Sequence, residues 1–274
     1  MQRFISDWEP APRRTGPEET LFAIGDVHGC TAQLDVLLGM VREAIAAAGD
    51  RRCALVMLGD YVDRGPDSIG AVRRIAGLQR EFGIPVTALR GNHDQYLIDA
   101  MGRSHDRRDF GIWLWNGGGT TLDELGVSSG AVELVEPALT ARQIRAALGS
   151  ELVAFLDRLE LYKRFGDYLF VHAGVHPQRT VEMHEPEELM WIREPFLAGR
   201  GWRHPYAVVH GHTPIGPEVR DHRIGVDSGC FRTGVLTAVE LKDGLMRLHL
   251  ATDARGLAEL PSSEARRFAP APRA

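Results

Sequence analysis

The sequence is poor in several features that mark particular classes of protein. Its 274 residues include three cysteines, Cys30, Cys53 and Cys230, and no CxxC pair, a set that favours a reducing compartment over a disulfide framework. No apolar run approaches the ~20 residues of a membrane helix, and the N-terminus lacks the apolar core of a signal peptide. We therefore expect a cytoplasmic protein without a membrane partner.

Positive charge is also scarce. Lys and Arg number 32 against 37 Asp and Glu, a formal net charge of −5, and Lys163 and Lys242 are the only lysines. Proteins that bind nucleic acids usually have a basic balance, so we expect no nucleic-acid partner, while the oligomeric state stays open. Apolar residues make up 44% of the chain, which is enough for a sizeable globular core.

The early part of the chain alternates between buried strands and amphipathic helices. Apolar runs at 21–24, 54–58 and 86–89 have the length of buried strands. Between them, residues 31–49 and 66–82 carry apolar side chains at helical spacing. This β-α-β-α-β order predicts parallel strands joined by crossover helices.

The later part has a different pattern. Runs at 168–171 and 207–209 again predict buried strands. Residues 235–241 and 245–251 alternate between apolar and polar side chains, and the Lys-Asp-Gly turn at 242–244 joins them, which predicts an antiparallel hairpin.

We expect one α/β domain over residues 20–252, with an arm at each end. The arms, 1–19 and 253–274, contain stretches rich in proline and charge that cannot bury much apolar area. An insert of residues 95–165 separates the two halves of the domain and should form a helical cap. It contains a Trp- and Gly-rich stretch at 112–122.

Polar residues that bind metals follow five of the predicted strands. In α/β sheets the carboxyl ends of strands face the crevice where ligands bind. Carboxylate, imidazole and amide groups without thiolates suit Mn, Fe or Zn, and two such ions roughly 3.5–4 Å apart can activate one water and neutralise a phosphoryl group. The five clusters are Gly25-Asp26-Val27-His28-Gly29, Gly59-Asp60-Tyr61-Val62-Asp63-Arg64-Gly65, Gly91-Asn92-His93-Asp94, His172-Ala173-Gly174 and His210-Gly211-His212-Thr213-Pro214.

These clusters, in this order, resemble the motifs of the phosphoprotein phosphatase branch of the calcineurin-like metallophosphoesterases. The resemblance spans residues 21–229 and rests on GDxHG, GDxVDRG, GNHD, HAG and a late GH. It implies the calcineurin-like metallophosphatase fold, an αββα arrangement with a central β-sandwich flanked by helices. Many relatives that act on diesters end in GHxH, whereas Pro214 stands here at the second histidine position, as in the phosphoprotein phosphatase branch.

The resemblance also implies a cofactor of two divalent metal ions per chain, with Mn²⁺ favoured and Fe or Zn open. Asp60 would bridge both ions, and His210 would lie outside the ligand shell. The first ion would be held by Asp26, His28 and Asp60, and the second by Asp60, Asn92, His172 and His212.

The remaining implied roles concern proton transfer and phosphate binding. His93 would act as the general acid, and Asp63 would orient its imidazole. Arg64 and Arg193 would bind the phosphate together with Asn92, since the planar guanidinium suits bidentate phosphate contacts. A metal-bridging hydroxide would attack phosphorus in line.

Two tryptophans and a glycine stretch in the insert have plainer interpretations. Trp113 and Trp115 are expected to belong to the core of the insert rather than to stack on a substrate. The Asn116–Gly119 stretch resembles bacterial members of the branch, but its residues by themselves indicate only a turn.

Three functions remain open at this stage. The leading hypothesis is a serine/threonine protein phosphatase, whose partner is a phosphoprotein or phosphopeptide substrate. The alternative is symmetrical hydrolysis of diadenosine tetraphosphate, and the third possibility is a scaffold that binds phosphoprotein without turnover.

Overall fold

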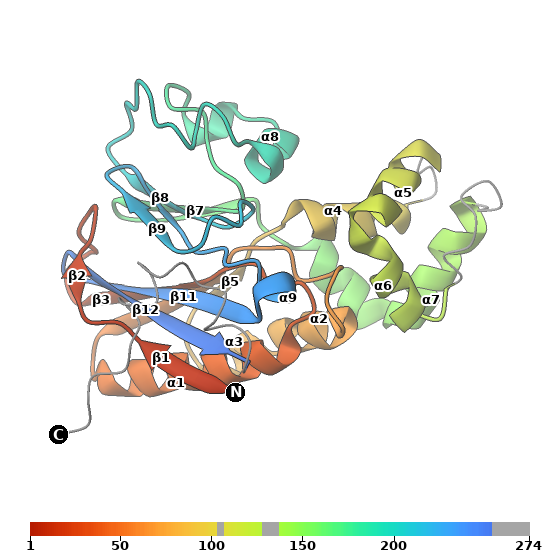
Figure 1. Ribbon diagram of the computed structural model, residues 1–274, viewed down its shortest axis with the longest axis horizontal. Coiled ribbons are helices and arrows are strands. Elements are labelled where there is room, and N and C mark those ends of the chain that lie inside the picture. Colours follow the sequence, from red (N-terminus) through yellow and green to blue (C-terminus); the bar gives the residue numbers. More distant parts are fainter. Residues whose placement is uncertain (103–106, 128–136, 254–274) are drawn as a thin grey trace.

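The computed structural model describes residues 1–102, 107–127 and 137–253 (Figure 1). Its described strands form two sheets. The first has the order β1-β12-β11-β3-β4-β5, with β2 also paired to β12, and the second has the order β6-β7-β8-β10-β9. The strands of the first sheet are β1 (Gln2–Ile5), β2 (Glu9–Pro10), β3 (Glu19–Ile24), β4 (Arg52–Met57), β5 (Val86–Ala88), β11 (Val235–Lys242) and β12 (Leu245–Thr252). Those of the second are β6 (Tyr162–Phe165), β7 (Tyr168–Val171), β8 (Ala207–His210), β9 (Glu218–Arg220) and β10 (Arg223–Gly225).

The predicted parallel strands and crossover helices are confirmed. Strands β3, β4 and β5 are parallel neighbours, joined by α1 (Thr31–Ala47), α2 (Ser68–Ala76) and α3 (Leu78–Phe82). The single helix predicted over 66–82 is wrong, because it is divided at Gly77 into α2 and α3. The carboxylate of Asp67 starts α2 by accepting the backbone N–H of Gly70 at 3.1 Å.

The two sheets pack face to face, and helices cover the first sheet from outside. Fully buried residues from both sheets, such as Val56 and Phe170, form one apolar cluster between them. A second cluster joins the outer face of the first sheet to α1, whose Leu34, Leu38 and Val41 are fully buried. Each such side chain stabilises the packing by roughly 1.5–3 kcal/mol. This is the predicted αββα sandwich.

The helical insert lies beside the sandwich at one end (Figure 1). Its described part contains helices and one π-helical turn, and α7 is interrupted at Gly149, which has φ 76° and ψ 163°. Two further short helices, α8 (Pro186–Trp191) and α9 (Cys230–Thr233), and the 3₁₀ turn η3 (Val181–Met183) follow outside the insert. The elements of the insert are α4 (Asn92–Ala100), α5 (Arg107–Trp113), the π-helical turn η1 (Leu114–Gly118), α6 (Gly119–Glu124) and α7 (Pro137–Asp157).

The N-terminal end of the chain differs from a simple arm. The N-terminal segment supplies an edge to the first sheet, because β1 pairs with β12 in antiparallel register, Phe4 opposite Leu250. The predicted hairpin between β11 and β12 is present, with left-handed backbone at Asp243 and Gly244. Of the predicted C-terminal arm, 253–274, residues 254–274 lie outside the described residues. Within the described parts of the chain, no helix is both long and apolar enough to cross a membrane.

Candidate functional site

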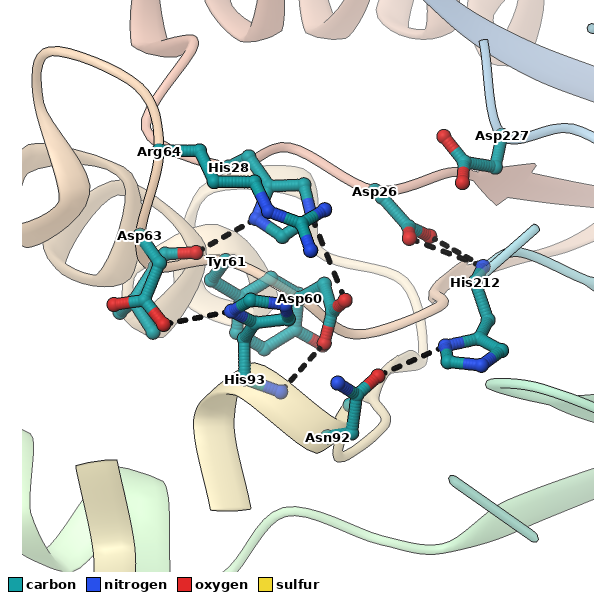
Figure 2. A network of polar contacts seen from close by, with 12 residues as sticks. Asp26, His28, Asp60, Tyr61, Asp63, Arg64, Asn92, His93, His212 and Asp227 are labelled. Atoms are coloured by element: carbon teal, nitrogen blue, oxygen red, sulfur yellow. Dashed lines mark hydrogen bonds and ion pairs between the residues drawn. The ribbon is translucent and has the colours of Figure 1, made fainter. Parts of the chain in front are cut away.

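The polar clusters converge at one place although they come from both sheets (Figure 2). Asp26 follows β3 and Asp60 follows β4, whereas Asn92 begins α4 just after β5. The second sheet contributes His172, directly after β7, and His212, just after β8. All five side chains are at least nine-tenths buried. The sequence prediction that these strand ends meet is confirmed by the fold.

Tight backbone turns bring these groups close together. Asp60 and His212 have left-handed backbone, with φ 53° and 63°, which is uncommon for residues with a side chain. A Cβ on Gly91 would lie 2.1 Å from Asp60 Oδ1, and one on Gly211 would lie 2.0 Å from Asp26 Oδ1. Glycine is therefore required at both positions for the carboxylates to approach.

The carboxylate of Asp60 lies between two groups of imidazoles. Its Oδ2 is 3.5 Å from His28 Nε2, and its Oδ1 is 3.4 Å from His172 Nε2. The described chain offers two groups of potential metal-binding atoms within 4.8 Å of one another, and Asp60 belongs to both. One group adds His28 and His93, and the other adds His172 and His212. This is the position expected of a carboxylate that bridges two ions.

Asn92 completes the second group. Its Oδ1 lies 3.0 Å from His172 Nε2 and 2.9 Å from His212 Nδ1. His172 is oriented because its Nδ1 donates to the backbone carbonyl of Leu58 at 2.8 Å. The Nε2 of His212 is buried without a hydrogen-bond partner. Imidazole nitrogens and an amide oxygen that point at one spot are a donor set that suits a divalent transition metal.

The imidazoles of His28 and His212 are held neutral, as metal ligands must be. Burial lowers the pKa of His28 to about 3 and that of His212 to about 2. The Nδ1 of His28 donates to the carbonyl of Val62 at 2.8 Å, so its Nε2 is unprotonated and carries a lone pair. Arg64 Nη1 donates to this Nε2 at 3.1 Å. The residues present therefore fit a divalent cation next to His28.

Asp26 is placed differently from the other predicted ligands. Its two oxygens accept the backbone N–H of His212 at 3.2 and 3.0 Å, and it belongs to neither metal-binding group of the described chain. The carboxylate of Asp227 lies beside it (Figure 2). Burial and the charges of Asp227 and Asp60 raise the pKa of Asp26 well above its usual range, and burial raises that of Asp227 to about 6. An excess of buried negative charge of this kind would be relieved by a dication.

Asp227 is outside the predicted site residues. It follows β10 in a Val-Asp-Ser-Gly cluster, and such polar clusters after strands are the pattern that pointed to the predicted site residues, so the signal was present in the sequence. Its side chain is 4% exposed, and its Oδ1 accepts the backbone N–H of Gly229 at 2.8 Å.

His93 and Asp63 form a buried pair, as predicted. His93 Nδ1 lies 2.7 Å from Asp63 Oδ2, which directs Nε2 away from the carboxylate and leaves it available for proton transfer. Two insert residues contact the same carboxylate: Trp113 donates its indole N–H to Oδ2 at 2.8 Å, and Thr121 donates its hydroxyl to Oδ1 at 2.6 Å. Trp113 is buried as expected, but the expectation that Trp115 belongs to the core is wrong, because it is 91% exposed.

The predicted phosphate-binding arginines lie at the edge of the site. Arg64 donates from Nε to the carbonyl of Asn116 at 3.2 Å, and its guanidinium lies over the ring of Phe231 at 4.9 Å. Arg193 is exposed just beyond α8, and its charge is among the influences that lower the pKa values of His172 and His212, after burial. Arg64 thus contacts the centre directly, through His28, whereas Arg193 acts on it through its charge.

His210 lies apart from these groups, as the sequence indicated. It is fully buried, and its Nε2 accepts a hydrogen bond from Arg223 Nη1 at 3.3 Å. Its Nδ1 lies 2.9 Å from the carbonyl of Gly211. These contacts occupy both ring nitrogens.

A cavity of about 800 Å³ opens beside Asn92, between α4, α5 and α8. Aromatic rings connect it to the centre: Tyr96 lies 6.0 Å from His93 and 5.7 Å from Trp191, and Trp191 lies 5.8 Å from His212. Among its described lining residues there is one cation, Arg90, and there are four carboxylates. These are Asp99, Asp109, Glu185 and Glu187.

Comparisons with known proteins point to one family. The family model described as calcineurin-like phosphoesterase matches residues 20–235. Serine/threonine-protein phosphatase 1 of Salmonella typhimurium is 28% identical over 240 residues, covering 81% of this chain and 92% of its own. A symmetrical bis(5'-nucleosyl)-tetraphosphatase of Janthinobacterium is 29% identical over 269 residues, covering 82% and 93%.

Solved structures show the same fold. The crystal structure of a protein proposed to be a diadenosine tetraphosphatase superposes with a TM-score of 0.56 at 25% identity, covering 85% of this chain and 93% of the other. The described residues could hold metal ions at the positions given above. The match over most of the chain, the fold and the site lead to one conclusion: this chain belongs to the calcineurin-like phosphoesterase family, whose members use a dinuclear centre of divalent metal ions.

Proposed function

We propose that this protein is a metal-dependent protein serine/threonine phosphatase, which hydrolyses phosphate monoesters on serine or threonine side chains. Residues 20–252 would form the catalytic domain, and the cytoplasm would be its compartment. The two ions, with Mn²⁺ favoured, would be held by Asp26, His28, Asp60, Asn92, His172 and His212.

The chain's own residues would divide the remaining work. When bound, two divalent ions supply an activated water and positive charge at the phosphoryl group. Arg64 and Arg193, together with the amide of Asn92, would bind the phosphate oxygens and orient the ester for in-line displacement. His93 would hold a proton at Nε2 and deliver it to the departing oxygen, while Asp63 keeps the imidazole in that tautomer and orientation.

The buried pair of His93 and Asp63 is the observation that carries the proposal. A serine or threonine alkoxide is strongly basic and must be protonated as the P–O bond breaks, whereas a phosphate leaving group departs without this help. A histidine fixed at 2.7 Å by a carboxylate that is itself fully buried is a general acid prepared for a poor leaving group. General-acid assistance is typically worth 10²–10⁴-fold in rate.

The charge around the cavity supports a peptide substrate over the dinucleotide. Among the described residues, no Lys or Arg forms an ion pair with Asp109, Glu185 or Glu187. Symmetrical cleavage of diadenosine tetraphosphate would release a nucleoside diphosphate whose negative charges would face these carboxylates. A neutral or basic peptide has no such repulsion, and Tyr96 and Trp191 offer it an apolar wall.

Hydrolysis of diadenosine tetraphosphate remains the alternative, because relatives with both names are similar to this chain over comparable lengths. The kcat/KM values of a phosphoserine peptide and of diadenosine tetraphosphate, measured side by side with Mn²⁺, separate the two functions. We expect the peptide to be the better substrate. A dominant activity on the dinucleotide would refute the proposal in favour of the alternative. If p-nitrophenyl phosphate is not turned over either, the third function, a non-catalytic scaffold that binds phosphoprotein, is favoured.

The role of His93 has its own test. We expect His93→Asn to slow hydrolysis of a phosphoserine peptide by about 10²-fold or more and that of p-nitrophenyl phosphate much less, because p-nitrophenolate leaves unaided. Metal content, determined by elemental analysis, should stay at the wild-type level. An equal loss on both substrates would show that His93 has a structural role only.

A further inference from the structure

We infer that the insert segment from Trp113 to Thr121 is a cradle that positions two catalytic-site residues at once, Asp63 and Arg64. The inference rests on the roles proposed above for these two residues. It gives a function to the Trp-Leu-Trp-Asn-Gly-Gly-Gly stretch, whose sequence indicates only a turn.

The cradle contacts both carboxylate oxygens of Asp63 and its backbone N–H, which it shares with Ser68 Oγ at 3.0 Å. The indole N–H of Trp113 donates to Oδ2 at 2.8 Å, the same oxygen that contacts His93 Nδ1. The hydroxyl of Thr121 donates to Oδ1 at 2.6 Å and accepts the backbone N–H of Asp63 at 3.0 Å. Asp63 and Thr121 are 0% exposed and Trp113 is 1% exposed. Water therefore does not compete for these bonds, and the carboxylate has one defined orientation toward His93.

The same segment holds Arg64 through its backbone. The N–H of Arg64 donates to the carbonyl of Gly117 at 3.3 Å, and its Nε donates to the carbonyl of Asn116 at 3.2 Å. These carbonyls are presented by the π-helical turn η1, in which Gly117 has φ 109°. The backbone N–H and the Nε of Arg64 are thus both fixed by this segment. The Nη1 of the same guanidinium lies beside His28 at the centre of the site.

Close contacts explain two of the three glycines of the segment. A Cβ on Gly117 would lie 2.8 Å from Arg64 Cγ, and a Cβ on Gly118 would lie 2.4 Å from the ring of Trp113. Both distances are shorter than real Cβ contacts, so a side chain at either position would push the cradle away from the residue it holds.

Backbone strain shows why Asp63 and Arg64 need external support. Both have left-handed backbone, with φ 74° and 68°. Two consecutive non-glycine residues in this region cost free energy, and such strain persists only where the surroundings over-determine it. The segment from Trp113 to Thr121 makes four hydrogen bonds with the two backbone N–H groups and the carboxylate of this turn.

The two halves of the cradle should have different kinetic signatures. Loss of the Trp113 or Thr121 contact acts through Asp63 on His93, so its effect should grow with the basicity of the leaving group. A displaced Gly117 acts through Arg64, so it should weaken phosphate binding for every substrate. A segment with a merely structural role would produce neither selectivity.

The experiment uses the full-length protein with Mn²⁺ and two aryl esters, phenyl phosphate and p-nitrophenyl phosphate, of which phenolate is the poorer leaving group. We expect Trp113→Phe and Thr121→Val to lower the ratio of kcat/KM for phenyl to p-nitrophenyl phosphate about tenfold. Thr121→Ser, which keeps the hydroxyl, should restore the ratio. Trp115→Phe is the matched control, because it makes the same chemical change at an exposed position of the same turn.

Binding of inorganic phosphate, measured by calorimetry, tests the second half without turnover. We expect Gly117→Ala to weaken it about tenfold with an unchanged ratio of the two esters, and Trp113→Phe to leave it unchanged. The inference is overturned if Trp113→Phe and Thr121→Val behave like Trp115→Phe, or if they slow both esters equally. It is likewise overturned if Gly117→Ala binds phosphate normally. A wild-type protein inactive on phosphoserine peptides would refute the proposed substrate while leaving these aryl phosphate and phosphate-binding results interpretable.

Discussion

Phe231 offers the sharpest test of how the site binds phosphate. Its ring lies under the guanidinium of Arg64, with 4.9 Å from Cζ to the ring centroid, and edge to face with His28 at 5.3 Å. The residue lies on α9, far from Arg64 in the sequence, and is 38% exposed. Together with the contacts of Arg64 to Asn116 and His28, this ring should hold the guanidinium in the orientation in which it meets phosphate.

The magnitude follows from the partial exposure of the ring. A cation–π contact contributes roughly 0.5–1 kcal/mol at exposed sites and about 2 kcal/mol when desolvated. A ring that is about one-third exposed should fall near 1 kcal/mol, which is about a fivefold change in an equilibrium constant. We therefore expect Phe231→Leu to raise the KM for p-nitrophenyl phosphate and the inhibition constant of inorganic phosphate about fivefold each, with kcat nearly unchanged.

The chain contains a matched control for this substitution. Arg42 lies over the ring of Phe82 at 5.0 Å, a nearly identical contact on α1 and α3 that is remote from the candidate metal centre. Phe82→Leu should change neither constant. A phosphate affinity of Phe231→Leu equal to that of the wild type would refute the reasoning, as would a loss confined to kcat.

Three other predictions concern charge in the buried parts of the protein. Asp60→Asn should lose metal from both sites and nearly all activity, since a neutral amide bridges two cations poorly. Elemental analysis measures the metal content and turnover of p-nitrophenyl phosphate measures the activity. Two retained ions would contradict the prediction. Chelation of the metal should lower the melting temperature, because buried carboxylates lose their counter-charge. Mn²⁺ at 100-fold its Kd should restore about 2.7 kcal/mol of the free energy of unfolding. Thermal unfolding at several metal concentrations measures both effects. Burial would raise the pKa of Glu240, but its hydrogen bonds with His249 and Arg247 hold that pKa below the usual value. The ionised carboxylate therefore stabilises the fold above about pH 4.5. This contribution is lost as the pH falls further. Glu240→Gln should therefore cost about 1–3 kcal/mol at pH 7 and progressively less in acid, measured by urea unfolding across pH.

Strand ends were predictable from the sequence because their signal is local. An apolar run followed by Gly-Asp or by Arg-Gly-Asn-His identifies both the strand and the polar side chains at its carboxyl end. Asp60 and His93 were recognisable as candidates for this reason, and their roles came from the family resemblance. The same runs predicted β3, β4, β5, β7, β8, β11 and β12, whereas β1, β2, β6, β9 and β10 were not predicted and the division into two sheets came from the family resemblance.

Contacts across long stretches of sequence could not be predicted in this way. Trp113 and Trp115 are two residues apart and chemically identical, yet one is buried against Asp63 and the other is 91% exposed. The π-helical turn that follows Trp113 changes the helical period, so spacing does not reveal which face is buried. Similarly, the pairing of β1 with β12 depends on a partner strand near the other end of the fold.

The division of the candidate ligands between two sheets has a consequence for how this protein assembles. Asp60 is attached to the first sheet, and His172 and His212 are attached to the second. An ion held by all three would tie the sheets together across the interface between them, so metal affinity would include the free energy of docking one sheet on the other. Occupancy would then make the two halves of the sandwich unfold in one cooperative step. During synthesis this tie could form only after His212 had emerged, when most of the chain is already made.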